Sequence, residues 1–140
     1  MSIVDIVTEP IDEKALLSRL DRKIHGAVVT FQGTVRQITD GREVKELEYE
    51  AYRDMALKKM WEIEGQVRAR WPIEDIAMVH RTGRLQLGEA SVVVVVAANH
   101  RAEAFEACRY AIDQIKEVVP IWKKEVWADE GARWVRAEAV

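Results

Sequence analysis

At 140 residues, with 49% hydrophobic and 32% charged side chains, the chain has the size and composition of one globular domain spanning residues 1–140. Its net charge of −3 provides no general attraction to nucleic acid or to an anionic membrane, so a site for an anion must be built locally. The single Cys excludes an internal disulfide framework, and the first residues do not resemble a signal peptide, so we expect a cytoplasmic protein.

Alternation of apolar and polar side chains predicts three strands in the first half of the chain, at residues 3–7, 26–36 and 43–52. Between the first two, a helix is expected to begin at Asp12 and to end before Gly26. The Asp40-Gly41 pair marks a turn between the second and third strands. The sequence therefore predicts that these two strands form an antiparallel hairpin.

The middle of the chain combines a long helix with strands. The helix is expected at residues 54–70, with Asp54 as its cap and Trp71-Pro72 ending it. Its predicted apolar stripe comprises Ala56, Met60, Ile63 and Val67, widened by Leu57 and Trp61. Strands are then predicted at residues 76–81, 85–87 and 91–98. The last of these reads SVVVVVAA and has no polar face, which predicts a central strand covered on both sides.

A further helix is expected at residues 100–119, because Pro120 ends it and apolar side chains recur at steps of three and four. The predicted core-facing stripe comprises Arg101, Phe105, Cys108, Ile112, Ile115 and Val119. Strands at residues 121–127 and 133–137 complete the chain. This order lacks regular strand–helix alternation, which favours an α+β fold with a mainly antiparallel sheet and about three main helices.

The first candidate site lies where the strand at residues 91–98 turns into the following helix. Free backbone N–H groups and the positive end of the helix dipole favour an anion beside His100, and Arg101 adds a bidentate donor for phosphate or carboxylate. In the alternative interpretation, Asn99 or His100 only caps the helix and Arg101 pairs with a surface carboxylate. The sequence leaves both interpretations open.

The second candidate site combines Lys116, near the helix end, with Lys123, seven residues later and across a proline. Two clustered ammonium groups can hold an anionic substrate and can lower a lysine pKa enough for proton transfer. Lys116 alone is better explained as a partner of the helix dipole, and it is the pair of lysines that indicates a site. Glu125 shares the strand face of Lys123 and either orients or neutralises it, while Arg36 suits either substrate contact or a solvated strand end.

The remaining reactive side chains give weaker signals. Cys108 lies in the apolar stripe and is predicted to be packing rather than a sulfur nucleophile. His25 and His80 have no Cys or carboxylate partners at the spacing of metal ligands. Because no phosphate-binding glycine loop, serine-hydrolase elbow or zinc pattern occurs, the corresponding enzyme classes lose support.

Four stretches, which together cover nearly the whole chain, carry a family resemblance. They are GAVVTFQGTVR at residues 26–36, LEYEAYRDMA at residues 47–56, the block at residues 80–125 that ends in PIWKKE, and RWV at residues 133–135. In these motifs the chain resembles the large, catalytic subunits of molybdopterin synthase. The resemblance implies an α/β hammerhead fold, and a homodimer of this chain within a heterotetramer that also contains a small ubiquitin-like sulfur-carrier subunit at each end.

The resemblance also implies a reaction. The C-terminal glycine thiocarboxylate of the carrier would deliver two sulfurs to cyclic pyranopterin monophosphate and form the dithiolene of molybdopterin, with no metal or cofactor in this step. An alternative from another class is a non-catalytic adaptor that binds a ubiquitin-like tail through its cationic pocket. A third is a small anion-binding domain without a carrier.

The resemblance assigns roles residue by residue. Lys116 and Lys123 match the active-site lysines of the family, and His100 and Arg101 match its pair beside the pterin phosphate. The other positions matched to substrate contacts are Thr34, Val35, Arg36, Lys124 and Glu125, and those matched to the pocket or carrier-tail channel are Phe31 and Arg70.

Overall fold

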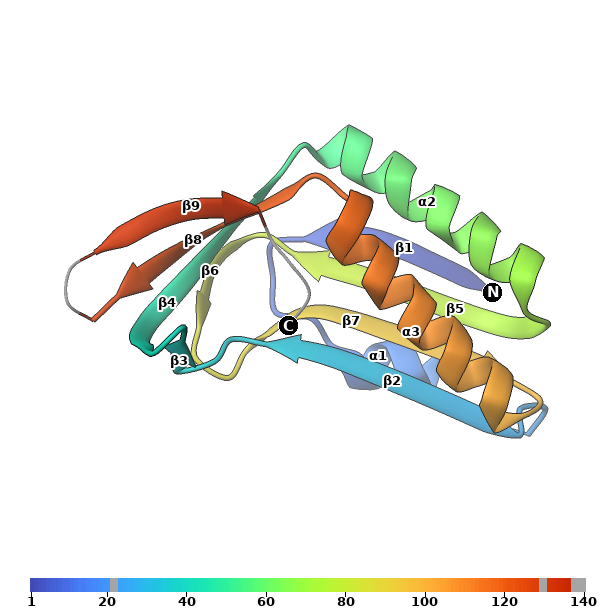
Figure 1. Cartoon of the computed structure of the whole chain (residues 1–140). Coiled ribbons are helices and arrows are strands. Elements are labelled where there is room, and N and C mark those ends of the chain that lie inside the picture. Colours follow the sequence, from blue (N-terminus) through green and yellow to red (C-terminus); the bar gives the residue numbers. More distant parts are fainter. Residues whose placement is uncertain (21–22, 129–130, 137–140) are drawn as a thin grey trace.

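The computed structural model describes residues 1–20, 23–128 and 131–136, and within them the chain forms two sheets and three helices (Figure 1). The first sheet has the order β1-β5-β7-β2. Its strands are β1 (Ser2–Val7), β5 (Ile73–Arg81), β7 (Ala90–Ala98) and β2 (Ala27–Thr34). β1 and β5 are parallel and the other neighbours are antiparallel, so the predicted α+β class with a mainly antiparallel sheet is confirmed.

The second sheet is built around one long strand, β4 (Arg42–Ala51). Its order is β3-β4-β8-β9, and β6 also pairs with β4. The other strands are β3 (Ile38–Thr39), β6 (Gly83–Gln86), β8 (Ile121–Trp127) and β9 (Ala132–Arg136). β8 has the predicted bounds, and the part of the last predicted strand at Ala137 lies outside the described residues.

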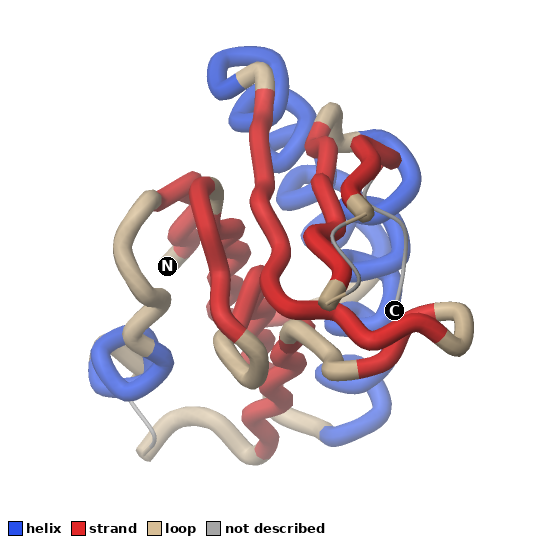
Figure 2. Tube along the Cα trace, turned by 90° about the vertical axis from the view of Figure 1, so that its left-hand side faces the viewer, coloured by secondary structure: helices blue, strands red, loops and turns tan. Residues whose placement is uncertain are grey.

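The helices cover the two faces of the first sheet unequally. The long helices α2 (Arg53–Arg70) and α3 (Arg101–Val118) lie on one face, and the short α1 (Glu13–Ser18) lies on the other, as Figure 2 shows from the left-hand side of Figure 1. Asp12 caps α1 by accepting a hydrogen bond from the Ala15 N–H at 3.0 Å, but the helix is shorter than predicted. None of the helices within the described residues is long and apolar enough to cross a membrane.

The central position predicted for the all-apolar strand is confirmed. β7 lies between β5 and β2, and its residues alternate between two clusters of buried side chains. Val92, Val94 and Val96 face α2 and α3, whereas Val93 and Val95 face α1. Because both faces are covered by helices, no position on this strand favours a polar side chain.

The predicted hairpin of the second and third strands is wrong. β2 pairs along its length with β7, and a bulge at Gly33/Thr34 bends the chain so that the Val35 N–H donates to the Glu89 carbonyl at 3.0 Å. Of the chain between β2 and the turn, only the two-residue β3 pairs with β4, across a turn in which Asp40 and Gly41 have φ of 51° and 75°. The Asp-Gly turn therefore exists, but it joins short strands, and the bulge sends β4 into the other sheet.

The predicted core-facing stripe of α3 is also wrong at its N-terminal end. Phe105 is 62% exposed and Arg101 is exposed, whereas the buried face contains three alanines. The buried residues of α3 are Ala104, Ala107, Cys108, Ala111, Ile112, Ile115 and Lys116. Small side chains let α3 approach the sheet and α2 closely, so the helix turns its alanine face inward and leaves the larger Phe105 outside.

On α2 the buried positions are Ala56, Met60, Ile63 and Val67, as the helical spacing predicts, whereas Trp61, which was expected to widen the stripe, is 47% exposed. Its cap differs from the prediction, because Tyr52 is the N-cap and Asp54 lies in the first turn. At the end of α3, the chain passes through Pro120 directly into β8 (Figure 1). The helix end therefore meets the second sheet, and this junction carries the polar side chains described next.

Candidate active site

Lys116 is buried at the C-terminal end of α3, with only 6% of its surface exposed. It lies one turn after Ile112 on the inward face, so the same packing that buries the alanines also buries this ammonium group. Burial, and to a smaller extent the positive charge of Lys123, together lower the pKa of Lys116 from 10.5 to about 8. Near neutral pH this lysine can therefore both donate and accept a proton.

Lys123 and Glu125 extend from β8 toward the same interior. They are two residues apart, so they share one face of the strand, and the Lys123 Nζ lies 3.6 Å from the Glu125 Oε1. The other carboxylate oxygen of Glu125 accepts a hydrogen bond from the Trp127 Nε1–H at 3.1 Å. Because Glu125 is only 3% exposed, the Trp127 contact and the Lys123 charge are what compensate for its burial.

Three polar side chains from the neighbouring strands complete this group. Tyr49 on β4 is directly opposite Lys123 on β8, and its ring meets the ring of His80 edge-on at 5.2 Å between centroids. Ser91 on β7 donates to the Gly33 carbonyl at 3.2 Å. Burial raises the pKa of Tyr49, a hydrogen bond with Ser91 opposes that change, and the Glu125 carboxylate adds to it.

We call these six side chains the lysine cluster: Tyr49, His80, Ser91, Lys116, Lys123 and Glu125. The sequence interpretation missed Tyr49 and Ser91, and it set His80 aside because it lacked metal-ligand partners. A usable signal was present, because His80 directly follows the apolar run IAMV near the end of the predicted strand. A polar residue that continues such a buried run is expected to be buried too, and a buried imidazole needs a partner or a function.

His100 and Arg101 do not lie near the lysine cluster within this chain. His100 is the exposed N-cap of α3, without a side-chain cap hydrogen bond, and Arg101 is the first helical residue. Lys116 follows Arg101 by fifteen helical residues, and at 1.5 Å per residue this places them about 22 Å apart along the helix axis. A single small substrate cannot contact both ends of α3, so one chain does not bring together all the predicted site residues.

The residues after β2 lie at the bulge that redirects the chain. Thr34 is the exposed last residue of β2, Val35 is buried, and Arg36 is exposed beyond the strand end. Lys124 lies on the outer face of β8, opposite to Lys123 and Glu125, with its Nζ 5.8 Å from the centre of the Trp134 ring. The structure therefore separates Lys124 from the lysine cluster although the two are neighbours in sequence.

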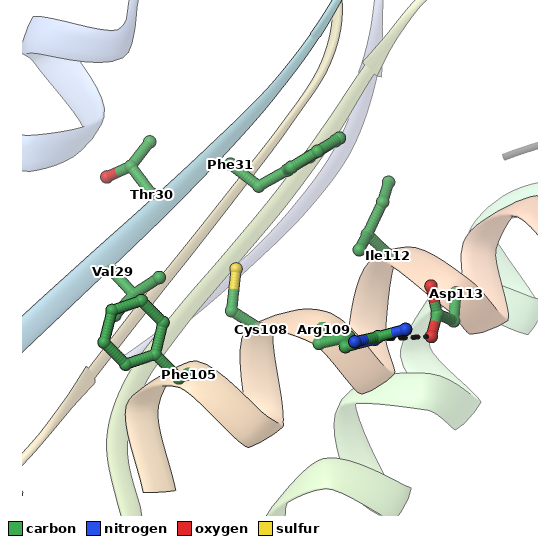
Figure 3. Close-up of a pocket in the computed structure, with 8 residues that line it drawn as sticks. All are labelled: Val29, Thr30, Phe31, Phe105, Cys108, Arg109, Ile112 and Asp113. Atoms are coloured by element: carbon green, nitrogen blue, oxygen red, sulfur yellow. Dashed lines mark ion pairs between the residues drawn. The ribbon is translucent and has the colours of Figure 1, made fainter. Parts of the chain in front are cut away.

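Phe31 lines a pocket of about 440 Å³ between β2 and α3 (Figure 3). Its lining residues are Val29, Thr30, Phe31, Phe105, Cys108, Arg109, Ile112 and Asp113. None of them belongs to the lysine cluster, so this mainly apolar pocket is separate from the candidate chemistry. Arg70, at the end of α2, lies over the Tyr110 ring with 4.4 Å between the guanidinium carbon and the ring centre.

Cys108 points from α3 toward the strands in this pocket (Figure 3). Its Sγ lies 3.9 Å from the Val94 carbonyl, and burial raises the pKa of the thiol to about 11. At neutral pH the thiol is therefore protonated and poorly nucleophilic. The predicted packing role fits this environment.

The chemistry available to the lysine cluster is that of charge and proton transfer. Two ammonium groups converge on one interior, where Glu125 pairs with Lys123, and the thiol lies in a separate pocket. Such a site stabilises an oxyanion and moves protons near neutral pH. Within the described residues no group of three or more His, Cys, Asp or Glu side chains is arranged to hold a metal ion.

Comparisons with known proteins identify the family. The model of the MoaE protein family matches residues 6–118. The molybdopterin synthase catalytic subunit of Bacillus subtilis is 42% identical over 96% of this chain and 85% of its own length. That of Halalkalibacterium halodurans is 45% identical over 93% of this chain and 83% of its own length. Both the family model and the relatives therefore span most of the chain.

Solved structures agree with this result. The crystal structure of molybdopterin synthase from Staphylococcus aureus superposes with a TM-score of 0.87 at 44% identity, covering 93% of this chain and 94% of that one. A complex of subunits 1 and 2 of the molybdopterin-converting factor from Helicobacter pylori shares the fold, with a TM-score of 0.75 at 21% identity over 96% and 89% of the two chains. The chain belongs to the family of molybdopterin synthase catalytic subunits, enzymes of molybdenum cofactor biosynthesis.

Proposed function

We propose that the chain uses the lysine cluster to transfer sulfur from the C-terminal thiocarboxylate of a small ubiquitin-like carrier subunit to cyclic pyranopterin monophosphate. The observation that carries this assignment is the burial of Lys116 beside Lys123, which gives Lys116 a pKa of about 8. A surface lysine would stay protonated at neutral pH, whereas this one is able to exchange its proton. A cytoplasmic location is part of the same proposal.

The proposed step exchanges sulfur for oxygen and needs no redox partner. The thiocarboxylate sulfur forms a bond to a substrate carbon while a C–O bond at that carbon breaks, and the leaving oxygen takes a proton from the Lys116 ammonium. The product of this half-reaction is a thioester between carrier and substrate. Lys123 stabilises the negative charge that develops on the acyl oxygen, and Glu125 keeps Lys123 oriented toward it.

Water then releases the carrier. Its oxygen attacks the acyl carbon, one of its protons passes to the neutral Lys116 amine, and the acyl C–S bond breaks. The substrate keeps the sulfur and takes the second proton, and the carrier leaves as a carboxylate. Lys116 is again an ammonium, so each sulfur transfer ends with the site in the state in which it began.

In a homodimer, site residues that lie far apart within one chain would meet across the interface between the two copies. Because about 22 Å of helix separates Arg101 from Lys116 within one chain, we propose that His100 and Arg101 of one copy serve the lysine cluster of the other. A two-fold axis makes two such composite sites per dimer. The exposed positions of His100 and Arg101 at the N-terminus of α3 support a role toward another molecule.

Mixing two inactive variants tests the composite site. Lys116→Ala and Arg101→Ala should each lose turnover alone, but a mixed dimer would retain one site with both residues intact. After equilibration of equal amounts, turnover should recover to about a quarter of the wild-type rate, since half the dimers are mixed and one site in each is intact. Absence of recovery, with mixed dimers demonstrated by mass spectrometry of differently tagged copies, would contradict the shared site.

A further inference from the structure

His80 belongs to the lysine cluster, but neither the family motif nor the proposed chemistry assigns it a role. It lies near the end of β5, only 1% exposed, and its Nδ1 is 2.8 Å from the Arg81 carbonyl oxygen. A carbonyl can only accept, so Nδ1 carries the hydrogen and Nε2 presents an unprotonated lone pair. Within the described residues this buried Nε2 has no hydrogen-bond partner.

The Nε2 of His80 is a buried hydrogen-bond acceptor without a partner among the described residues, and such an atom requires an explanation. Leaving one unpaired costs about 1–3 kcal/mol, and most buried polar atoms in folded proteins avoid this cost by pairing. The imidazole stays neutral, because burial and the nearby charge of Lys116 lower the pKa of His80 to about 3. His80 is therefore a fixed acceptor at physiological pH and neither a general base nor a charge.

The groups around His80 identify what it can accept from. Lys116 approaches from α3, close enough for its charge to act on the imidazole. Tyr49 of β4 presents its ring to the His80 ring, and its hydroxyl is paired with Ser91 of β7. Lys123 and Glu125 of β8 pair with each other.

The neighbouring Arg81 is directed elsewhere. Its guanidinium forms an ion pair with Glu89 at 2.9 Å and donates to the Thr8 carbonyl at 3.2 Å. Within the described residues the Lys116 ammonium has no hydrogen-bond or ion-pair partner, whereas the Lys123 ammonium is paired with Glu125. Lys116 is therefore the available donor, and its flexible stem lets the ammonium turn toward Nε2.

We propose that His80 is the positioning residue of Lys116, and that its Nε2 accepts a hydrogen bond from the Lys116 ammonium. The contact holds the amine in the interior between turnovers and favours its protonated form. The role rests on the proposed function only in that Lys116 is the proton carrier; the contact itself is a property of the free chain. It can therefore be tested without any sulfur transfer.

Nitrogen NMR of the free chain, labelled with ¹⁵N at histidine, tests the contact directly. An Nε2 lone pair that accepts a hydrogen bond resonates upfield of a free one, so Lys116→Met should move the His80 Nε2 signal downfield. His25 is the internal control, because it is also buried but pairs with Asp75 at 2.7 Å, and its signal should not move. An unchanged His80 signal would overturn the proposal.

Trace acetylation of Lys116, followed by mass spectrometry across pH, measures the consequence. His80→Leu removes the acceptor, and a hydrogen bond to a charged group contributes about 1.5–3 kcal/mol, so the inflection of the labelling curve should fall by at least about one pH unit. His80→Gln keeps an acceptor near the position of Nε2 and should restore the wild-type curve. Equal curves for wild type and His80→Leu would refute the role, and if His80→Leu does not fold, the NMR comparison decides.

If reconstitution of sulfur transfer fails, the NMR and labelling measurements still test the contact between His80 and Lys116. Conversely, unchanged NMR and labelling curves beside normal sulfur transfer would overturn the role of His80 and leave the proposed function standing. The two proposals can therefore fail independently.

Discussion

Replacing Lys116 by Met should stabilise the protein while abolishing turnover. Met has nearly the length of the lysine stem and carries no charge, so it fills the buried position without the desolvation cost. Burial and Lys123 lower the pKa of Lys116 from 10.5 to about 8, and at about 1.4 kcal/mol per pKa unit this corresponds to about 3 kcal/mol. We therefore expect Lys116→Met to unfold with a free energy up to about 3 kcal/mol higher at pH 7.

The difference in unfolding free energy between Lys116→Met and the wild type should decrease as the pH rises. A lysine with a lowered pKa binds fewer protons in the folded than in the unfolded state between pH 8 and 10.5, so wild-type stability rises relative to the variant across that window. The difference should be largest below pH 8 and should vanish near pH 10.5. Since both proteins share every other titrating group, the difference isolates Lys116.

Urea unfolding followed by tryptophan fluorescence, at pH values from 7 to 10.5, measures this difference. Lys58→Met is the matched control, because Lys58 is exposed on α2 and its replacement should give no pH-dependent change. If Lys116→Met were less stable than wild type at pH 7, or if the difference stayed constant up to pH 10.5, the inference that Lys116 is a strained, proton-exchanging lysine would be refuted.

Two further substitutions test the neighbouring assignments. Glu125→Gln leaves Lys123 without its buried counter-charge and should lower the free energy of unfolding by about 3 kcal/mol. The control, Glu62→Gln in the exposed Lys59–Glu62 pair, should cost less than about 1 kcal/mol. Urea unfolding measures both, and equal losses would mean that the buried pair stabilises the fold no more than the exposed one. Cys108→Ala should leave sulfur transfer unchanged and lower stability by about 1 kcal/mol, and a lost rate in a folded variant would contradict the packing role.

Local sequence patterns correctly predicted the parts of the fold in which the burial of a residue depends only on the face of its own helix or strand. The uninterrupted apolar run of β7 required cover on both sides, and the spacing on α2 identified its four buried residues. The hairpin failed because strand pairing depends on where a bulge turns the chain. Gly33, an isolated glycine inside the predicted strand, was a signal for this bulge, but it did not indicate that the chain would continue into the other sheet. The α3 stripe failed because hydrophobicity favoured Phe105 over the alanines that pack closely.

The sequence predicted the part of the candidate site that comes from neighbouring segments of the chain. Lys116 and Lys123 are joined by a short segment with a proline, so their convergence follows from local geometry, and the burial of Lys116 follows from the inward face of α3. His80 and Tyr49 come from strands far away in the sequence, so only the assembled fold brings them together. Helix geometry alone predicts the distance between Arg101 and Lys116, because a rise of 1.5 Å per residue over fifteen helical residues places them about 22 Å apart.

Reconstitution of the reaction tests the central claim most directly. The chain is mixed with a thiocarboxylated ubiquitin-like carrier and cyclic pyranopterin monophosphate, and formation of the dithiolene is measured together with conversion of the carrier to its carboxylate. The wild type should form dithiolene and consume two carriers per product, while folded Lys116→Ala and Lys123→Ala variants should bind the carrier without forming product. Carrier binding by the wild type without dithiolene, or normal turnover by both lysine variants, would contradict the account.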